Sequence, residues 1–135
     1  MGTATATALL AFAGWYLLLT FALGIFRSAL VLSGQKAANS FSPSGSDVSP
    51  FGQRLNRARD NCYETLPIFV ALALAASISG RLTVTDPLAP WVLYARIGQS
   101  VTHVASTSVP AVQVRFAFFL AQLVIYLIWT LRLLG

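Results

Sequence analysis

Long apolar runs, broken by short polar segments, make up most of the chain. The first run covers residues 4–31 and carries no charge before Arg27. It predicts a membrane-spanning helix, because a bilayer core of about 30 Å needs about 20 apolar residues. A cleaved signal peptide is the competing interpretation, since Ala11-Phe12-Ala13 resembles a cleavage site. No Lys or Arg precedes the run, and the run continues past that site, which favours the spanning helix.

Three further helices are expected after this one. Residues 33–50 are rich in Ser, Gly, Asn and Pro and predict a polar loop. Apolar runs then predict spans over residues 51–79, 90–107 and 111–133. Turn residues separate these spans, so consecutive helices run in opposite directions. The expected fold is therefore all-α, an integral membrane protein built as an up-and-down bundle of four helices.

Composition agrees with a membrane protein of one domain. Of the 135 residues, 56% are hydrophobic and 10% charged, whereas a soluble domain carries about a quarter charged residues. This excludes a disordered chain and a soluble two-domain enzyme. The net charge of +5 comes from basic residues that are spread singly along the chain, so no nucleic-acid interface is expected.

The distribution of basic residues predicts the orientation of the chain. The first loop and the start of the second helix are the more basic side, with Lys36, Arg54, Arg57 and Arg59. The opposite side has Arg81 and Arg132. Because cytoplasmic loops carry the excess of Lys and Arg, we expect the first and third loops in the cytoplasm and both termini outside.

Polar side chains recur at helical spacing within the predicted spans. They are Arg54, Arg57, Asn61 and Glu64 in the second helix, Arg96, Gln99 and His103 in the third, and Arg115 and Gln122 in the fourth. An ionisable group at the centre of a span costs at least about 2.5 kcal/mol, so each needs an explanation. We expect these stripes to face inward near the cytoplasmic interface. Structural ion pairs such as Arg57 with Glu64 are one explanation, but the surplus of arginine favours an anionic ligand.

Other chemistry has weaker support in the sequence. The single His103 and single Cys62 do not make a metal site, so no metal is expected. A proton-coupled exporter of cations, with Glu64 as the titrating carboxylate, is a further class that four short helices allow. The excess of intramembrane arginine disfavours a cation path.

The segment 57–67 carries the signature of a known family. Arg57, Ala58, Asn61, Glu64 and Pro67 stand at the spacing of the motif that opens the second helix of the MAPEG family, the membrane-associated proteins in eicosanoid and glutathione metabolism. The chain resembles this family over essentially its whole length. The resemblance implies a homotrimer of four-helix subunits that binds glutathione between neighbouring subunits, near the cytoplasmic side.

The same resemblance implies roles for individual residues. Arg57, Asn61 and Glu64 correspond to the second-helix residues that hold glutathione, with Arg57 on a carboxylate and Glu64 on the amino group. Arg96 and Gln99 fall where the third helix lines the same site, together with His103, where many relatives have Tyr. Arg115 corresponds to the fourth-helix arginine that stabilises the glutathione thiolate and is the expected catalytic residue.

The implied function is that of a membrane-bound glutathione transferase or peroxidase. Glutathione is the co-substrate, and its thiolate attacks a lipophilic electrophile or hydroperoxide that enters from the bilayer. The match to Arg115 requires a short insertion after His103, and a gapless match places Val112 there instead. The alternative is therefore a non-catalytic member of the family that binds a lipid as a scaffold.

Overall fold

The computed structural model describes residues 3–41 and 49–135, and every regular element in these ranges is a helix. The helices are α1 (Ala4–Leu32), α2 (Pro50–Ile78), α3 (Leu82–Thr85), α4 (Ala89–Ala105) and α5 (Val109–Leu134). The all-α class is thus confirmed. The middle of the predicted loop 33–50 lies outside the described residues.

The described part holds five helices, one more than the four expected. The additional element is α3, a single turn in the segment between Gly80 and Pro90, where turn residues predict a loop. The hydrogen bond from Asp86 N to Leu82 O, 2.8 Å long, closes this turn. A helix this short has no hydrophobic periodicity of its own, so the sequence pattern does not reveal it.

Local signals in the sequence fix the ends of the long helices. The side chains of Ser49 and Ser108 cap α2 and α5 by accepting hydrogen bonds from Gly52 N and Ala111 N. Ser-Gly pairs end α1 and α2. Gly34 and Gly80 follow the last turns with positive φ angles of 79° and 69°, a conformation that glycine adopts without a steric cost.

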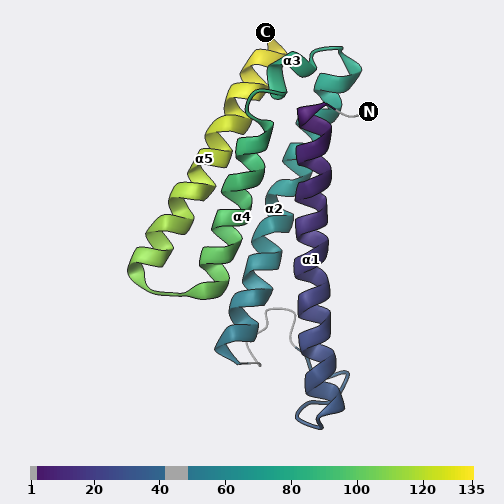
Figure 1. Cartoon of the computed structure of the whole chain (residues 1–135), viewed down its shortest axis with the longest axis vertical. Helices are drawn as coiled ribbons and strands as arrows, with labels where there is room; N and C mark the ends of the chain where they lie inside the picture. Colours follow the sequence, from purple (N-terminus) through teal and green to yellow (C-terminus); the bar gives the residue numbers. More distant parts are fainter. Residues whose placement is uncertain (1–2, 42–48) are drawn as a thin grey trace.

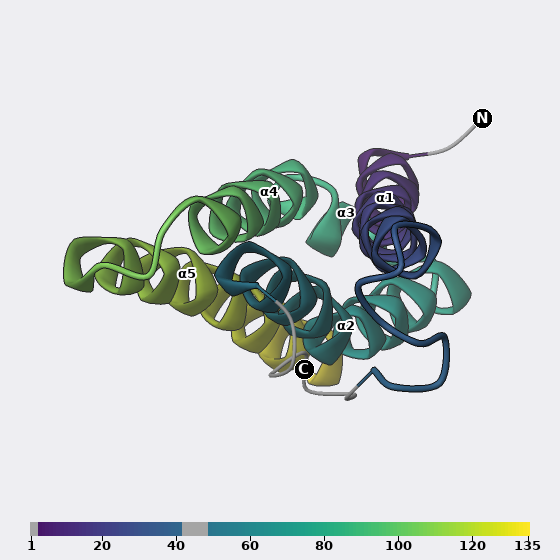
Figure 2. The same ribbon diagram turned by 90° about the horizontal axis from the view of Figure 1, so that it is seen from below.

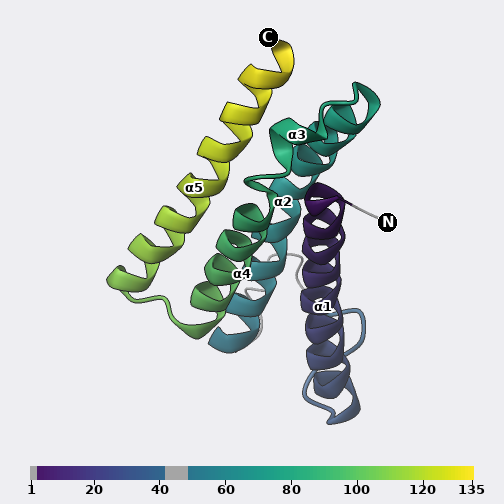
Figure 3. The same ribbon diagram turned by 45° about the horizontal axis from the view of Figure 1, so that its top comes forward.

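Three of the helices, α1, α2 and α5, are long and apolar enough to cross a membrane. The fourth long helix, α4, has 17 residues and a length of about 25 Å. The four run alternately up and down, so that both chain termini lie at one end and the connection between α4 and α5 at the other (Figures 1 and 3). Seen along the bundle, α2 and α4 pack together, α1 lies on one side of this pair, and α5 lies on the other (Figure 2).

The buried face of α2 is a regular stripe of small and apolar side chains. Its members recur at spacings of three and four residues: Leu55, Ala58, Cys62, Thr65, Phe69, Ala73 and Ala76. This spacing presents one helix face to α1 and α4. Phe69 continues the stripe into an aromatic cluster, with ring centroids 5.5 Å from Phe12 and 5.7 Å from Trp129. The aromatic cluster therefore lies toward the start of α1 and the end of α5, and the apolar core continues toward the other end of the bundle with Leu23 and Leu55.

Two arginines, Arg81 and Arg54, donate hydrogen bonds to backbone carbonyls at the carboxyl ends of helices. Arg81 donates to the carbonyl oxygens of Leu133 and Arg132, at 3.0 and 2.7 Å, in the last turn of α5. Arg54 Nε donates to Val104 O at 2.7 Å, in the last turn of α4. These carbonyls have no partner within their helix, and a cation there also interacts favourably with the helix dipole. Arg54 therefore has a structural role in the described chain.

A polar cluster joins the start of α1 to the connection between α3 and α4. Asp86 accepts hydrogen bonds from the backbone N–H of Thr5, at 2.9 Å, and from the Thr5 hydroxyl. The Thr5 and Thr85 hydroxyl oxygens are 2.6 Å apart. Burial raises the pKa of the Asp86 carboxyl, but the hydrogen bonds from Thr5 and Thr3 outweigh it and hold the pKa below the ordinary value of 3.8.

We expect Asp86→Ala to lower the stability of the purified protein by about 1 kcal/mol, the typical cost of losing a helix cap. Because the pKa of Asp86 is lowered on folding, its contribution is complete above pH 3.8 and is lost as the pH falls through the folded value. Thermal unfolding in detergent, at neutral and at acidic pH, measures both effects. A variant that loses as much stability on acidification as the parent would contradict this role.

Candidate functional site

An open cleft of about 250 Å³ lies between three helices. Its lining residues are Asn61 from α2, Gln99 from α4, and Val112, Arg115, Phe116 and Phe119 from α5. Polar and aromatic side chains therefore line the same cleft. Residues that the sequence assigned to one site on three separate helices, Asn61, Gln99 and Arg115, are brought together here.

The course of α5 creates this cleft. The buried residues of α5 are Gln122, Tyr126 and Trp129, all in its second half, whereas the first half has none. Val112 and Arg115 lie nearly one turn apart and both line the cleft. The alignment with an insertion assigns the thiolate position to Arg115, and the gapless alignment assigns it to Val112. Both residues line this cleft, so the Arg115 side chain is present there under either alignment. The Nε atom of Arg115 is buried and has no hydrogen-bond partner within the described residues.

Gln99 is hydrogen-bonded to Gln122, a residue that was not among the site residues expected from the sequence. Gln122 Nε2 donates to Gln99 Oε1 at 2.9 Å and to Phe118 O at 3.1 Å. Both glutamines are almost completely buried. The helices approach closely at this point, since a Cβ atom added to Gly98 would lie 2.8 Å from the Phe118 ring. The seven-residue spacing of Arg115 and Gln122 was the only sequence signal of this contact.

Arg96 lies inside the bundle and does not line the cleft. It is fully buried, its Nη2 donates to Thr65 Oγ1 at 2.7 Å, and its guanidinium carbon is 5.6 Å from the centre of the Phe12 ring. Its Nε and Nη1 atoms have no partner within the described residues. A buried cation without a counter-ion is costly. Arg96 forms no ion pair within the described residues, and the Glu64 carboxylate acts on it from a longer distance.

Arg57 and Glu64 lie on the exposed surface of α2, although we expected the whole polar stripe to face inward. The reason is the regular apolar stripe of α2, which contains Ala58 and Thr65 and takes the buried face. Arg57 and Glu64 precede these residues by one position each and are rotated from that face by about 100°. Asn61, which is half-buried, lies at the border between the two faces.

His103 is buried near the end of α4, and its Nδ1 atom has no partner within the described chain. The charges of Arg115, Arg57 and Arg96 all act on this side chain. The arginines of α2, α4 and α5 therefore produce a common region of positive potential around the end of α4. Opposite charge from this chain is scarce, because none of the three arginines forms an ion pair among the described residues.

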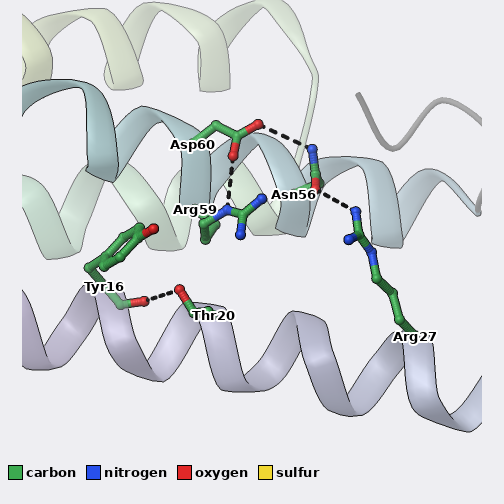
Figure 4. Close-up of polar contacts among 6 residues, drawn as sticks. All are labelled: Tyr16, Thr20, Arg27, Asn56, Arg59 and Asp60. Carbon is green, nitrogen blue, oxygen red and sulfur yellow. Dashed lines mark hydrogen bonds and ion pairs between the residues drawn. The ribbon is translucent and has the colours of Figure 1, made fainter. Parts of the chain in front are cut away.

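Asp60 is engaged elsewhere and does not neutralise these arginines. Its carboxylate forms an ion pair with Arg59 at 2.8 Å and accepts a hydrogen bond from Asn56 Nδ2 at 3.2 Å (Figure 4). Asn56 Oδ1 in turn accepts from Arg27 Nη2 at 3.1 Å, which links α1 to α2. This network is a connection between helices on the side of α2 that faces α1. The surplus positive charge near the cleft remains.

Metal chemistry has no support in the described part of the chain. No group of three or more His, Cys, Asp or Glu side chains there is close enough to hold an ion. Cys62, the single cysteine, is buried among the helices. The polar groups that line the cleft are the amides of Asn61 and Gln99 and the guanidinium group of Arg115.

The helices define a membrane protein, and its open cleft is lined by polar, aromatic and arginine side chains. Comparison with known families assigns this class to a particular family: the model of the MAPEG family matches residues 5–135. The chain belongs to the MAPEG family. No curated protein and no solved structure matches the chain. Family membership covers glutathione transferases and peroxidases as well as non-catalytic members.

Proposed function

We propose that this protein is a membrane-bound glutathione transferase or peroxidase whose site is the cleft between α2, α4 and α5. The observation that carries the proposal is the meeting of Asn61, Gln99 and Arg115 from three helices in that cleft. All three offer N–H donors, and Arg115 has an unpaired buried Nε. A site of this kind suits an anionic, acceptor-rich ligand.

The chemistry of glutathione fits these groups. Its thiol has an ordinary pKa of about 8.5 and is mostly protonated at neutral pH. The thiolate is the nucleophile, and a guanidinium group beside the sulfur in a poorly hydrated site favours it. In conjugation the sulfur forms a bond to the electrophilic carbon as the leaving group departs. In hydroperoxide reduction, two glutathione molecules are oxidised to the disulfide and the peroxide becomes an alcohol and water.

Arg57 and Glu64 complete the proposed site from the outer face of α2. Their opposite charges match the carboxylates and the ammonium group of the tripeptide. Both are exposed on the single chain, and an exposed charge inside a span is expensive in lipid. A second copy packed on this face would enclose them, so we propose that glutathione binds between subunits of a homotrimer, in which α4 is the fourth span. The distribution of basic residues favours a site on the cytoplasmic side.

A scaffold protein that binds a lipid without catalysis is the second candidate. The observation that favours it is the apolar part of the cleft, where Val112, Phe116 and Phe119 lie beside the polar groups. Such a surface holds an acyl chain without activating a thiol. The two candidates differ in one property, which is whether the bound sulfur is ionised.

The assay that tests the proposal is conjugation of glutathione to a generic aryl halide by the purified, detergent-solubilised protein. The transferase predicts turnover that saturates with glutathione and exceeds the reaction in detergent alone. A parallel assay with a lipid hydroperoxide tests the peroxidase activity. The absence of both activities, with retention of bound lipid, would favour the scaffold.

The homotrimer gives a separate prediction. We expect native mass spectrometry in mild detergent to record a species of three times the 14.5 kDa chain mass, because the charged face of α2 needs a protein surface rather than lipid. Only monomers or dimers under these conditions would refute the trimer. Glutathione added before the measurement should stabilise the assembly, since it binds at the proposed subunit boundary.

A further inference from the structure

Gln122 lies behind the cleft, is fully buried and does not line it. Its side-chain amide nevertheless has a defined orientation. The Phe118 backbone carbonyl can only accept a hydrogen bond, and Gln122 Nε2 donates to it at 3.1 Å. The second hydrogen of that group needs another acceptor, and Gln99 Oε1 provides it at 2.9 Å. Reversing the Gln122 amide would place its oxygen against these two acceptors, whereas in the present orientation Gln122 Oε1 lacks only a partner of its own within the described residues.

The orientation of Gln99 follows from this contact. Since Gln99 Oε1 accepts from Gln122, its NH2 group occupies the other side of the planar amide. Gln99 lines the cleft, and no hydrogen bond from its Nε2 occurs within the described residues. Both amide hydrogens therefore remain available to a group bound in the cleft. Without Gln122, the amide of Gln99 would be free to present either oxygen or nitrogen.

We infer that Gln122 is a positioning residue, which fixes the NH2 group of Gln99 toward the cleft and thereby makes the wall formed by Gln99 and Arg115 selective for a hydrogen-bond acceptor. This inference rests on the proposed function and specifies its ligand: the acceptor is an anionic sulfur or carboxylate of glutathione. Arg115 has hydrogen-bond donors only. Because Gln122 occupies the oxygen of Gln99, Gln99 also presents only donors to the cleft. A ligand that presents an N–H or O–H donor to this wall meets no acceptor on either residue.

A double-mutant cycle tests whether Gln122 acts through Gln99. The variants are Gln99→Met, Gln122→Met and their combination, because methionine keeps the length of the side chain without its amide. Isothermal titration measures glutathione affinity. We expect Gln122→Met to weaken binding about fivefold in the parent, the usual effect of one neutral hydrogen bond, and to have no further effect on Gln99→Met. Ser100→Ala is the matched control, since its buried hydroxyl has no partner within the described chain, and it should bind like the parent.

A purely structural role gives a different result. It predicts that Gln122→Met lowers thermal stability and leaves glutathione affinity unchanged, or that the two substitutions weaken binding additively. Either result overturns the inference while the proposed function stands. If the parent itself binds no glutathione, the proposed function fails, and the orientation of Gln99 is decided by the next measurement.

That measurement uses no ligand. In protein labelled with nitrogen-15 at glutamine, the side-chain hydrogens of Gln99 should exchange with deuterated solvent, whereas those of Gln122 should be protected. In Gln122→Glu, measured at a pH at which the carboxyl is ionised, the carboxylate can only accept, so the Gln99 NH2 group should turn to it and become protected. Protected Gln99 hydrogens in the parent, or exchange that is the same in Gln122→Glu, would overturn the inference.

Discussion

Replacing Arg115 by alanine lowers the turnover of the glutathione-conjugating reaction at pH 7 by roughly 25-fold, if the guanidinium group lowers the thiol pKa by about two units from about 8.5. The reason is that the thiolate fraction at neutral pH falls by this factor. We expect glutathione affinity to change little, because the proposed contacts of Asn61, Gln99 and Arg57 with the peptide remain in this variant. The pH profile of turnover moves upward by the same two units, so activity recovers in alkaline solution.

The matched control for this variant is Val112→Ala. Val112 lines the same cleft nearly one turn away, and its truncation changes the shape of the cleft without changing the charge. We expect the pH profile of Val112→Ala to remain that of the parent. Equal pH profiles for Arg115→Ala and the parent would show that Arg115 is an interface or packing residue, and the gapless alignment would then describe the chain better.

Replacing Arg57 by alanine weakens glutathione binding by between about 10-fold and 100-fold, since hydrogen bonds to charged groups contribute roughly 1.5–3 kcal/mol. Arg57 is exposed and has no ion-pair partner in the described part of the chain. Its loss therefore leaves no buried carboxylate of the protein unpaired. Isothermal titration measures the affinity, and native mass spectrometry records whether the variant is still assembled.

Arg59→Ala is the control on the same helix. Arg59 lies two residues further on and forms an ion pair with Asp60, on the side that faces α1 (Figure 4). Its removal takes away the same charge without touching the cleft, so glutathione affinity should stay near that of the parent. Equal losses in both variants would indicate a general effect of net charge, and unchanged affinity in Arg57→Ala would exclude this residue from the site. Disassembly of Arg57→Ala alone would indicate a structural role.

The sequence was sufficient for the class of fold because the bilayer imposes it. Twenty or more apolar residues in a row have few alternatives to a helix, and Ser-Gly pairs at residues 33–34 and 79–80 mark where two helices end. The sequence also led to the meeting of Asn61, Gln99 and Arg115, since polar residues inside spans need partners. The signature 57–67 led to the family.

Contacts between helices account for what the sequence did not reveal. Helical spacing groups Arg54 with Arg57, but only the position of α4 shows that Arg54 binds Val104 O. The α2 helix carries a polar stripe that contains Arg57 and an apolar stripe that contains Ala58. Arg57 is exposed because the apolar stripe is the buried one. Gln122 and Gln99 are joined by a contact between separate helices, and no spacing within one helix encodes it.

Ionisation of bound glutathione by the cleft is measured by the ultraviolet thiolate absorbance of the parent complex. The purified protein is saturated with glutathione and titrated with pH, with detergent and glutathione alone as the reference. We expect thiolate absorbance at neutral pH and a titration midpoint about two units below the ordinary thiol pKa of about 8.5. A complex that titrates at the same pH as free glutathione would contradict it, and the lipid-binding scaffold would then be the better description.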